Sequence, residues 1–269
     1  MNTPPSVITA AATDSVPAAL AARFRVVLVG TQHPGNIGAA ARALKTMGLG
    51  RLVLVAPEDY PADEAFRRAA GADDVLAAAP AVGTLAEAVA DCHLVLGCTA
   101  RSRRVQLEEH APRQAAALAV GRAVTGGEVA LVFGRERTGL TNEELQLCQA
   151  AVHIPANPEY SSLNLAAAVQ VLTYELRISL LEHGTGAPMA DATPDEAPAS
   201  HAHLEGFYAQ LGETLDAIDF HKGRAPDSAM RKLRRLFHKA AMNEQEVRLL
   251  RGILADAQRM ARLAGGAGG

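Results

Sequence analysis

Short, uninterrupted runs of apolar residues recur between residues 24 and 154, and segments with helical spacing of their apolar residues lie between them. Runs of this length, rich in Val and Leu, are typical of strands covered on both faces in a parallel sheet. Their alternation with helices predicts an α/β domain with a mostly parallel sheet. The predicted strands are Phe24–Val29, Leu52–Val55, His93–Gly97, Val129–Phe133 and Ala151–Ile154.

The predicted helices of this domain are Ile37–Met47, Ala62–Ala70, Thr84–Ala90, Arg113–Arg122, Asn142–Gln149 and Leu163–Glu182. Further on there is no strand pattern, and three amphipathic helices are predicted at His203–Asp219, Asp227–Ala240 and Glu244–Leu263. Proline, acidic and small residues dominate the segment between the two regions, which predicts a linker. The predicted organisation is a disordered tail over 1–22, an α/β domain over 23–183, a linker over 184–203, a small all-α domain over 204–263 and a disordered tail over 264–269.

Charge is distributed unevenly along the chain. The 26 Lys and Arg against 29 Asp and Glu give a net charge of -3, which taken alone argues against a nucleic-acid partner. Residues 200–269, however, hold 11 basic and 8 acidic residues, and residues 228–240 contain no acid at all. A solvated helix face and a helix that contacts phosphates both explain this basic stretch.

Several classes of protein are not expected. The sequence contains no uninterrupted apolar run of about 18 residues, so a membrane span is not expected. The first 20 residues lack the basic start of a signal peptide. Three cysteines without a C-x-x-C pair argue against a disulfide framework or a zinc site, and favour a reducing cytoplasm. His201 and His203 have no plausible third ligand, so we expect solvated histidines and no metal.

The common nucleotide-binding and hydrolase signatures are missing. Asn36 stands where a phosphate loop requires Lys, and neither G-x-G-x-x-G after a strand nor G-x-S-x-G occurs. Three segments remain, each next to the end of a predicted strand: residues 27–48, 130–145 and 153–176. Asn36 is expected to cap the helix of the first segment. Thr141 and Glu144 have capping-box spacing in the second.

The sequences Asn36-Ile-Gly-x-x-x-Arg42, Phe133-Gly-Arg-Glu136 and Asn157-Pro-x-x-Ser-Ser-Leu-Asn164 resemble the three ordered motifs of the SpoU-type RNA 2'-O-ribose methyltransferases, in the SPOUT superfamily. The resemblance implies a deep trefoil knot at the C-terminal end of the α/β domain, S-adenosylmethionine as methyl donor, and a homodimer. Residues 97–103 and the helical region extend it to the TrmJ-type tRNA methyltransferases. That branch implies tRNA as partner and nucleotide 32 of the anticodon loop, cytidine or uridine, as target.

The resemblance also implies roles for individual residues. The cofactor-binding residues would be Cys98, Thr99, Ala100, Gly134, Ile154, Ser161, Ser162 and Leu163. Arg42 would be catalytic, and since a guanidinium stays protonated in proteins, we interpret it as a stabiliser of phosphate and alkoxide charge rather than as a base. Glu136 is expected to fix an arginine, either Arg42 or Arg135. The RNA-binding residues would be Asn36, Arg101, Arg103, Arg135, Glu136, Asn164, Arg231, Lys232, Arg234 and Arg235.

Two other functions are compatible with part of the pattern. A knotted RNA-binding protein without catalysis would keep the basic helix and lose the cofactor loops. A ribose methyltransferase acting on ribosomal RNA would use the same chemistry, and the α/β domain alone does not separate it from a tRNA enzyme.

Overall fold

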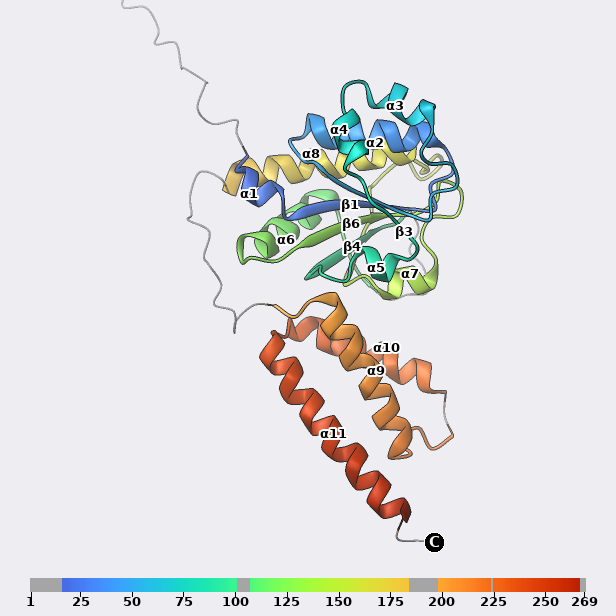
Figure 1. Cartoon of the computed structure of the whole chain (residues 1–269), viewed down its shortest axis with the longest axis vertical. Coiled ribbons are helices and arrows are strands. Elements are labelled where there is room, and N and C mark those ends of the chain that lie inside the picture. The colour runs from blue at the N-terminus through green and yellow to red at the C-terminus, as the bar shows by residue number, and fades with distance from the viewer. Residues whose placement is uncertain (1–15, 101–106, 184–197, 224, 267–269) are drawn as a thin grey trace, which may run out of the picture.

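A parallel sheet of seven strands forms the centre of the first domain of this computed structural model, which describes residues 16–100, 107–183, 198–223 and 225–266 (Figure 1). The strand order is β3-β2-β1-β6-β4-β7-β5, and every neighbouring pair is parallel. The strands are β1 Phe24–Val29, β2 Arg51–Val55, β3 Ala81–Val82, β4 Leu94–Cys98, β5 Glu108–His110, β6 Val129–Phe133 and β7 Ala150–Val152. The predicted parallel α/β sheet is therefore confirmed.

Helices cover both faces of this sheet, and alternate residues of its central strands are buried on opposite sides. In β1, Val26 and Leu28 belong to one core, whereas Val27 and Val29 belong to the other. The first core also takes in residues of the longest helices of this domain, and the second is covered by shorter ones. The helices are α1 Ala18–Ala21, α2 Pro34–Thr46, α3 Asp63–Ala69, α4 Asp73–Ala77, α5 Leu85–Ala88, α6 Pro112–Val124, α7 Asn142–Gln146 and α8 Leu165–His183.

A short N-terminal helix is present where a disordered tail was predicted. Helix α1 lies within residues 1–22, and its Leu20 and Ala21 are buried in the first core. Two residues separate α1 from β1, so this short segment lies near the amino end of that strand. Residues 1–15 of the predicted tail, like most of the predicted linker, lie outside the described residues.

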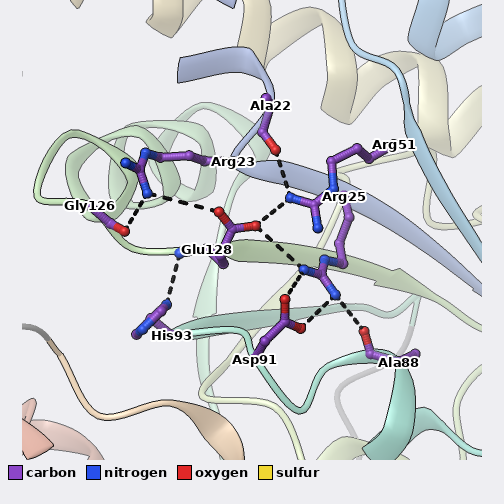
Figure 2. A network of polar contacts seen from close by, with 9 residues as sticks. All are labelled: Ala22, Arg23, Arg25, Arg51, Ala88, Asp91, His93, Gly126 and Glu128. Atoms are coloured by element: carbon purple, nitrogen blue, oxygen red, sulfur yellow. Dashed lines mark hydrogen bonds and ion pairs between the residues drawn. The ribbon is translucent and has the colours of Figure 1, made fainter. Parts of the chain in front are cut away.

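A polar network joins the amino ends of the central strands (Figure 2). Arg25, only 6% exposed, donates to both carboxylate oxygens of Asp91 at 2.7 and 2.5 Å and to the carbonyl of Ala88 at 3.0 Å. Glu128 pairs with Arg25 at 3.4 Å and also with Arg51. Burying a guanidinium is costly unless it is paired, and here two carboxylates balance it.

Three further helices form a separate bundle with its own core (Figure 1). They are α9 His201–Ala217, α10 Pro226–Ala240 and α11 Glu244–Gly266. Phe207 and Tyr208 of α9 are almost fully buried, and Phe207 packs edge-on against Phe237 of α10 with ring centroids 4.8 Å apart. The three predicted helices are confirmed, although α9 begins at His201 inside the predicted linker.

The start of α9 is hydrogen-bonded to the first domain. The backbone N–H groups of His201 and Ala202 donate to the carbonyls of Cys92 at 2.7 Å and Ala90 at 2.9 Å. His201 is 2% exposed, and its two ring nitrogens have no hydrogen-bond partner in the described structure, so the prediction of a solvated histidine was wrong. Burial lowers the pKa of His201, which keeps the ring neutral.

Two absences apply only to the described part of the chain. No helix there is both long enough and apolar enough to cross a membrane. Nor do the residues placed by the structure include a group of three or more His, Cys, Asp or Glu side chains able to hold a metal ion.

Candidate functional site

A cavity of about 440 Å³ lies at the carboxyl ends of β4, β6 and β7. These three strands are neighbours in the sheet, although their loops are far apart in the sequence. All eight residues expected to bind a cofactor line the cavity: Cys98, Thr99, Ala100, Gly134, Ile154, Ser161, Ser162 and Leu163. Pockets of this size and position commonly bind small molecules in parallel α/β proteins.

Hydrogen bonds between and within the loops hold the cavity together. The N–H of Thr99 donates to the carbonyl of Val152 at 2.9 Å, and the ring of His153 lies 3.3 Å from the carbonyl of Thr99. The loop after β6 turns back on itself, since the N–H of Gly139 donates to the carbonyl of Arg135 at 2.8 Å. Backbone groups and small side chains therefore make much of the cavity wall.

Gly134 shows how closely the second loop is folded. A Cβ added there would lie 2.2 Å from backbone atoms of Gly139 and Leu140. Backbone cannot yield as a flexible side chain can, so this position requires glycine. The loop residues Arg137 and Thr138 also line the cavity, although no sequence motif singled them out. Both residues follow Gly134 closely in the sequence, and this proximity was the available signal that they belong to the site.

Glu136 connects the three segments on which the resemblance rests. Its carboxylate accepts hydrogen bonds from the N–H of Gln32 at 3.0 Å, the N–H of His33 at 3.2 Å and the side-chain amide of Asn36 at 2.9 Å. Asn36 in turn accepts from the amide of Asn164 at 3.0 Å. Burial raises the pKa of Glu136, but these hydrogen bonds outweigh burial and hold the pKa below its ordinary value.

Two predictions about these residues were wrong. Glu136 does not fix Arg135, because Arg135 pairs with both carboxylate oxygens of Glu144 at 3.0 and 3.1 Å. Asn36 does not cap α2, because the helix begins at Pro34 after His33 and the Asn36 amide is engaged by Glu136 instead. The predicted capping box of Thr141 and Glu144 at the start of α7 is confirmed.

Arg42 lies on α2, six residues after Asn36 and about 9 Å further along the helix axis. Its side chain is exposed, and it is not among the residues that line the cavity. Within the described residues, Arg42 pairs neither with Glu136 nor with another carboxylate. Arg101 and Arg103 lie outside the described residues, so the structure does not place them.

The basic residues predicted on α10 divide into two groups. Arg231, Lys232 and Arg235 are exposed. Arg234 faces α9, where it binds the carboxylate of Glu205 at 2.7 Å and lies 4.4 Å over the ring of Tyr208. Its charge is already balanced, and it holds α10 against α9.

A parallel α/β domain with a backbone-lined cavity at the carboxyl ends of its central strands is typical of enzymes that bind a small-molecule cofactor. The SpoU rRNA methylase family matches residues 23–174, and the C-terminal domain of the tRNA methyltransferase TrmJ matches residues 202–266. The chain belongs to the SpoU methylase family.

Individual relatives agree with this membership. The chain is 50% identical over 245 residues to the tRNA (cytidine/uridine/adenosine-2'-O-)-methyltransferase TrmJ of Pseudomonas aeruginosa, with 89% of this chain and 95% of the relative covered. It is 49% identical to the tRNA (cytidine/uridine-2'-O-)-methyltransferase TrmJ of Salmonella typhimurium, over 87% and 95% of the two chains. The crystal structure of TrmJ from Z. mobilis superposes with a TM-score of 0.73 and 37% identity, over 86% of this chain and 97% of that one.

Proposed function

We propose that this protein transfers the methyl group of S-adenosylmethionine to a ribose 2'-hydroxyl of tRNA. The observation that carries the proposal is that all eight residues expected to bind the cofactor line the same cavity. The membership of the SpoU family and the activities named for the TrmJ relatives support the same reaction.

The lining fits the cofactor chemically. The loops around Thr99, Gly134 and Ser162 offer backbone N–H and C=O groups, which recognise an adenine edge and an amino-acid carboxylate without large side chains. When bound, S-adenosylmethionine supplies a methyl group that its sulfonium already activates. The protein then has mainly to orient the ribose and to stabilise the charge that develops on its 2'-oxygen.

We assign that stabilisation to Arg42, with Asn36 and Asn164 holding the nucleotide. The guanidinium stays protonated, so it would contact the neighbouring phosphate and the developing alkoxide, while phosphate or water removes the proton. Since Arg42 does not line the cavity of its own chain, we further propose a homodimer in which Arg42 of one protomer serves the cavity of the other.

Three finer statements belong to the same proposal. The target would be nucleotide 32, cytidine or uridine, as the TrmJ-type resemblance implies. A trefoil knot is supported by the strand order, in which β7 lies between β4 and β5. After forming β6, the chain has to return and insert β7 between two strands that precede it in the sequence. A cytoplasmic location is supported by three unpaired cysteines and by the tRNA substrate.

The decisive experiment compares the wild type with Arg42→Ala. We expect the variant to keep its thermal stabilisation by S-adenosylmethionine and to lose methyl transfer to tRNA, with nucleoside mass spectrometry locating the modified position. Near-normal transfer would overturn the role of Arg42. A wild type that binds RNA but neither binds the cofactor nor transfers methyl groups would instead be a non-catalytic RNA-binding protein, and transfer to ribosomal RNA alone would replace tRNA as substrate.

A further inference from the structure

A second cavity, of about 620 Å³, lies between the α/β domain and helix α10. On the sheet side it is lined by Leu94 and Ala150, which begin β4 and β7. The cofactor cavity lies at the other ends of the same strands. A strand of five residues spans roughly 15 Å, so the two cavities open at opposite ends of one sheet. We call the second cavity the interdomain cleft.

Cations from both domains line the interdomain cleft. Helix α10 contributes Arg231, Arg235 and Lys239, whose four-residue spacing places them on one helix face, and α6 contributes Arg122. Glu108 is the acidic residue among its described lining residues, and it lies 3.8 Å from His110. The described lining therefore carries a clear excess of positive charge.

Arg122 is the most informative of these residues. It is half-buried, and it has no carboxylate partner within the part of the chain that the structure describes. Burial lowers the pKa of Arg122, because partial desolvation disfavours its charged form. Arg25, at the amino end of β1, shows the contrasting case, since Asp91 and Glu128 balance it (Figure 2).

Among the described residues, the surroundings of Arg122 supply packing contacts but no carboxylate partner. Its aliphatic stem packs at Gly127, where a Cβ would lie 2.8 Å from the Arg122 Cδ. The neighbouring ring of His93 accepts a hydrogen bond from the N–H of Glu128 at 2.9 Å, and burial together with the charge of Arg122 lowers the pKa of His93. A partly desolvated cation without a carboxylate partner among the described residues favours an anionic ligand.

We infer that the interdomain cleft binds backbone phosphates of the RNA substrate, which are held between Arg122 of the α/β domain and the cationic face of α10. The inference rests on the proposed function and adds a binding site to it. Arg231 and Lys239 are eight residues apart, so the cations extend over about 12 Å of helix. A row of this length suits successive phosphates of a nucleic-acid strand better than one small anion.

Binding of unmodified tRNA to full-length Arg122→Met tests the inference, because Met keeps the apolar stem and removes the guanidinium. We expect the dissociation constant to rise about 10-fold and the slope of log K against log salt to fall by about 0.7 to 0.9, the value of one phosphate contact. Arg231→Gln should act similarly. Arg259→Gln, which removes an exposed α11 cation paired with Asp256 at 3.1 Å, is the matched control and should change neither quantity.

Other outcomes separate this inference from the proposed function. If the wild type methylates tRNA but Arg122→Met keeps the wild-type affinity and salt slope, the cleft is not an RNA site, whereas the methyltransferase assignment stands. Stabilisation of the wild type by tripolyphosphate, lost in Arg122→Met without any change in tRNA binding, would make the cleft a small-anion site and overturn the inference. The thermal midpoint of Arg122→Met should not fall, because an unpaired, desolvated cation contributes no folding stability; a fall together with unchanged RNA binding would indicate a structural role.

Discussion

Removing the Glu136 carboxylate should damage both stability and methyl transfer, because this one group holds the start of α2 against the loop after β6. It accepts three hydrogen bonds, two of them from backbone N–H groups that precede α2. Each hydrogen bond to a charged group contributes about 1.5–3 kcal/mol. Since His33 is exposed and water can replace part of the loss, we expect Glu136→Ala to lower the free energy of unfolding by about 2–4 kcal/mol in total.

Glu136→Gln is the matched variant. Its amide oxygen can still accept from His33 and Asn36, but its NH₂ group would face the N–H of Gln32, so we expect a loss of about 1–2 kcal/mol. Because the pKa of Glu136 is lowered in the folded protein, its contribution is complete above the ordinary value of 4.5 and is lost as the pH falls through the folded value. The stability difference between wild type and Glu136→Gln should therefore shrink in acid.

The two readouts are urea unfolding between pH 7 and pH 3 and methyl transfer to tRNA at pH 7. The shift of α2 in Glu136→Ala should also displace Arg42 and Asn36, and a displacement near 1 Å costs up to about 100-fold in rate. Wild-type stability in Glu136→Ala would refute the idea that these hydrogen bonds hold α2. Reduced stability with unchanged transfer would show that the position of α2 does not govern the reaction.

Three further predictions concern other parts of the molecule. Gly134→Ala should abolish stabilisation by S-adenosylmethionine in a thermal-shift assay because its Cβ would overlap backbone 2.2 Å away, whereas Gly50→Ala, with nothing within 4 Å, should behave as wild type. Arg234→Ala should destabilise the helical bundle by about 1–3 kcal/mol in chemical unfolding, since it leaves Glu205 without its partner. Burial lowers the pKa of His238 to about 4 from 6.5, so the bundle should lose stability as the pH falls from 6.5 towards 4, and calorimetry should show a flatter profile for His238→Phe.

The sequence was sufficient to predict the elements whose signal is local. The central strands β1 and β6 match their predicted bounds because each is a continuous apolar run. The strands β3 Ala81–Val82 and β5 Glu108–His110 were missed, since the first has two residues and the second is polar and lies at the edge of the sheet. Strand formation there depends on a neighbouring strand, and no pattern within the segment reports it.

In the candidate site, too, features set by neighbouring residues could be predicted, whereas contacts between distant segments could not. The resemblance selected eight residues that lie together around one cavity, and the capping box of α7 followed from residue spacing alone. Neither the bond between Glu136 and Asn36 nor the pairing of Arg135 with Glu144 could be predicted. Each depends on which of several nearby polar groups a folded loop brings within 3 Å, and a motif does not specify that choice.

In the interdomain cleft, the distribution of charge also depends on folding. Counting along the sequence assigns the positive charge to residues 200–269 and leaves the preceding part of the chain acidic. Folding brings the end of α6 to the face of α10, so that Arg122, a residue of the acidic part, joins the cations of the basic part. A phosphate in the cleft would therefore contact both domains at once. Replacing the α10 cations should therefore weaken the phosphate contact at Arg122 as well, since the two sides of the cleft hold the same strand.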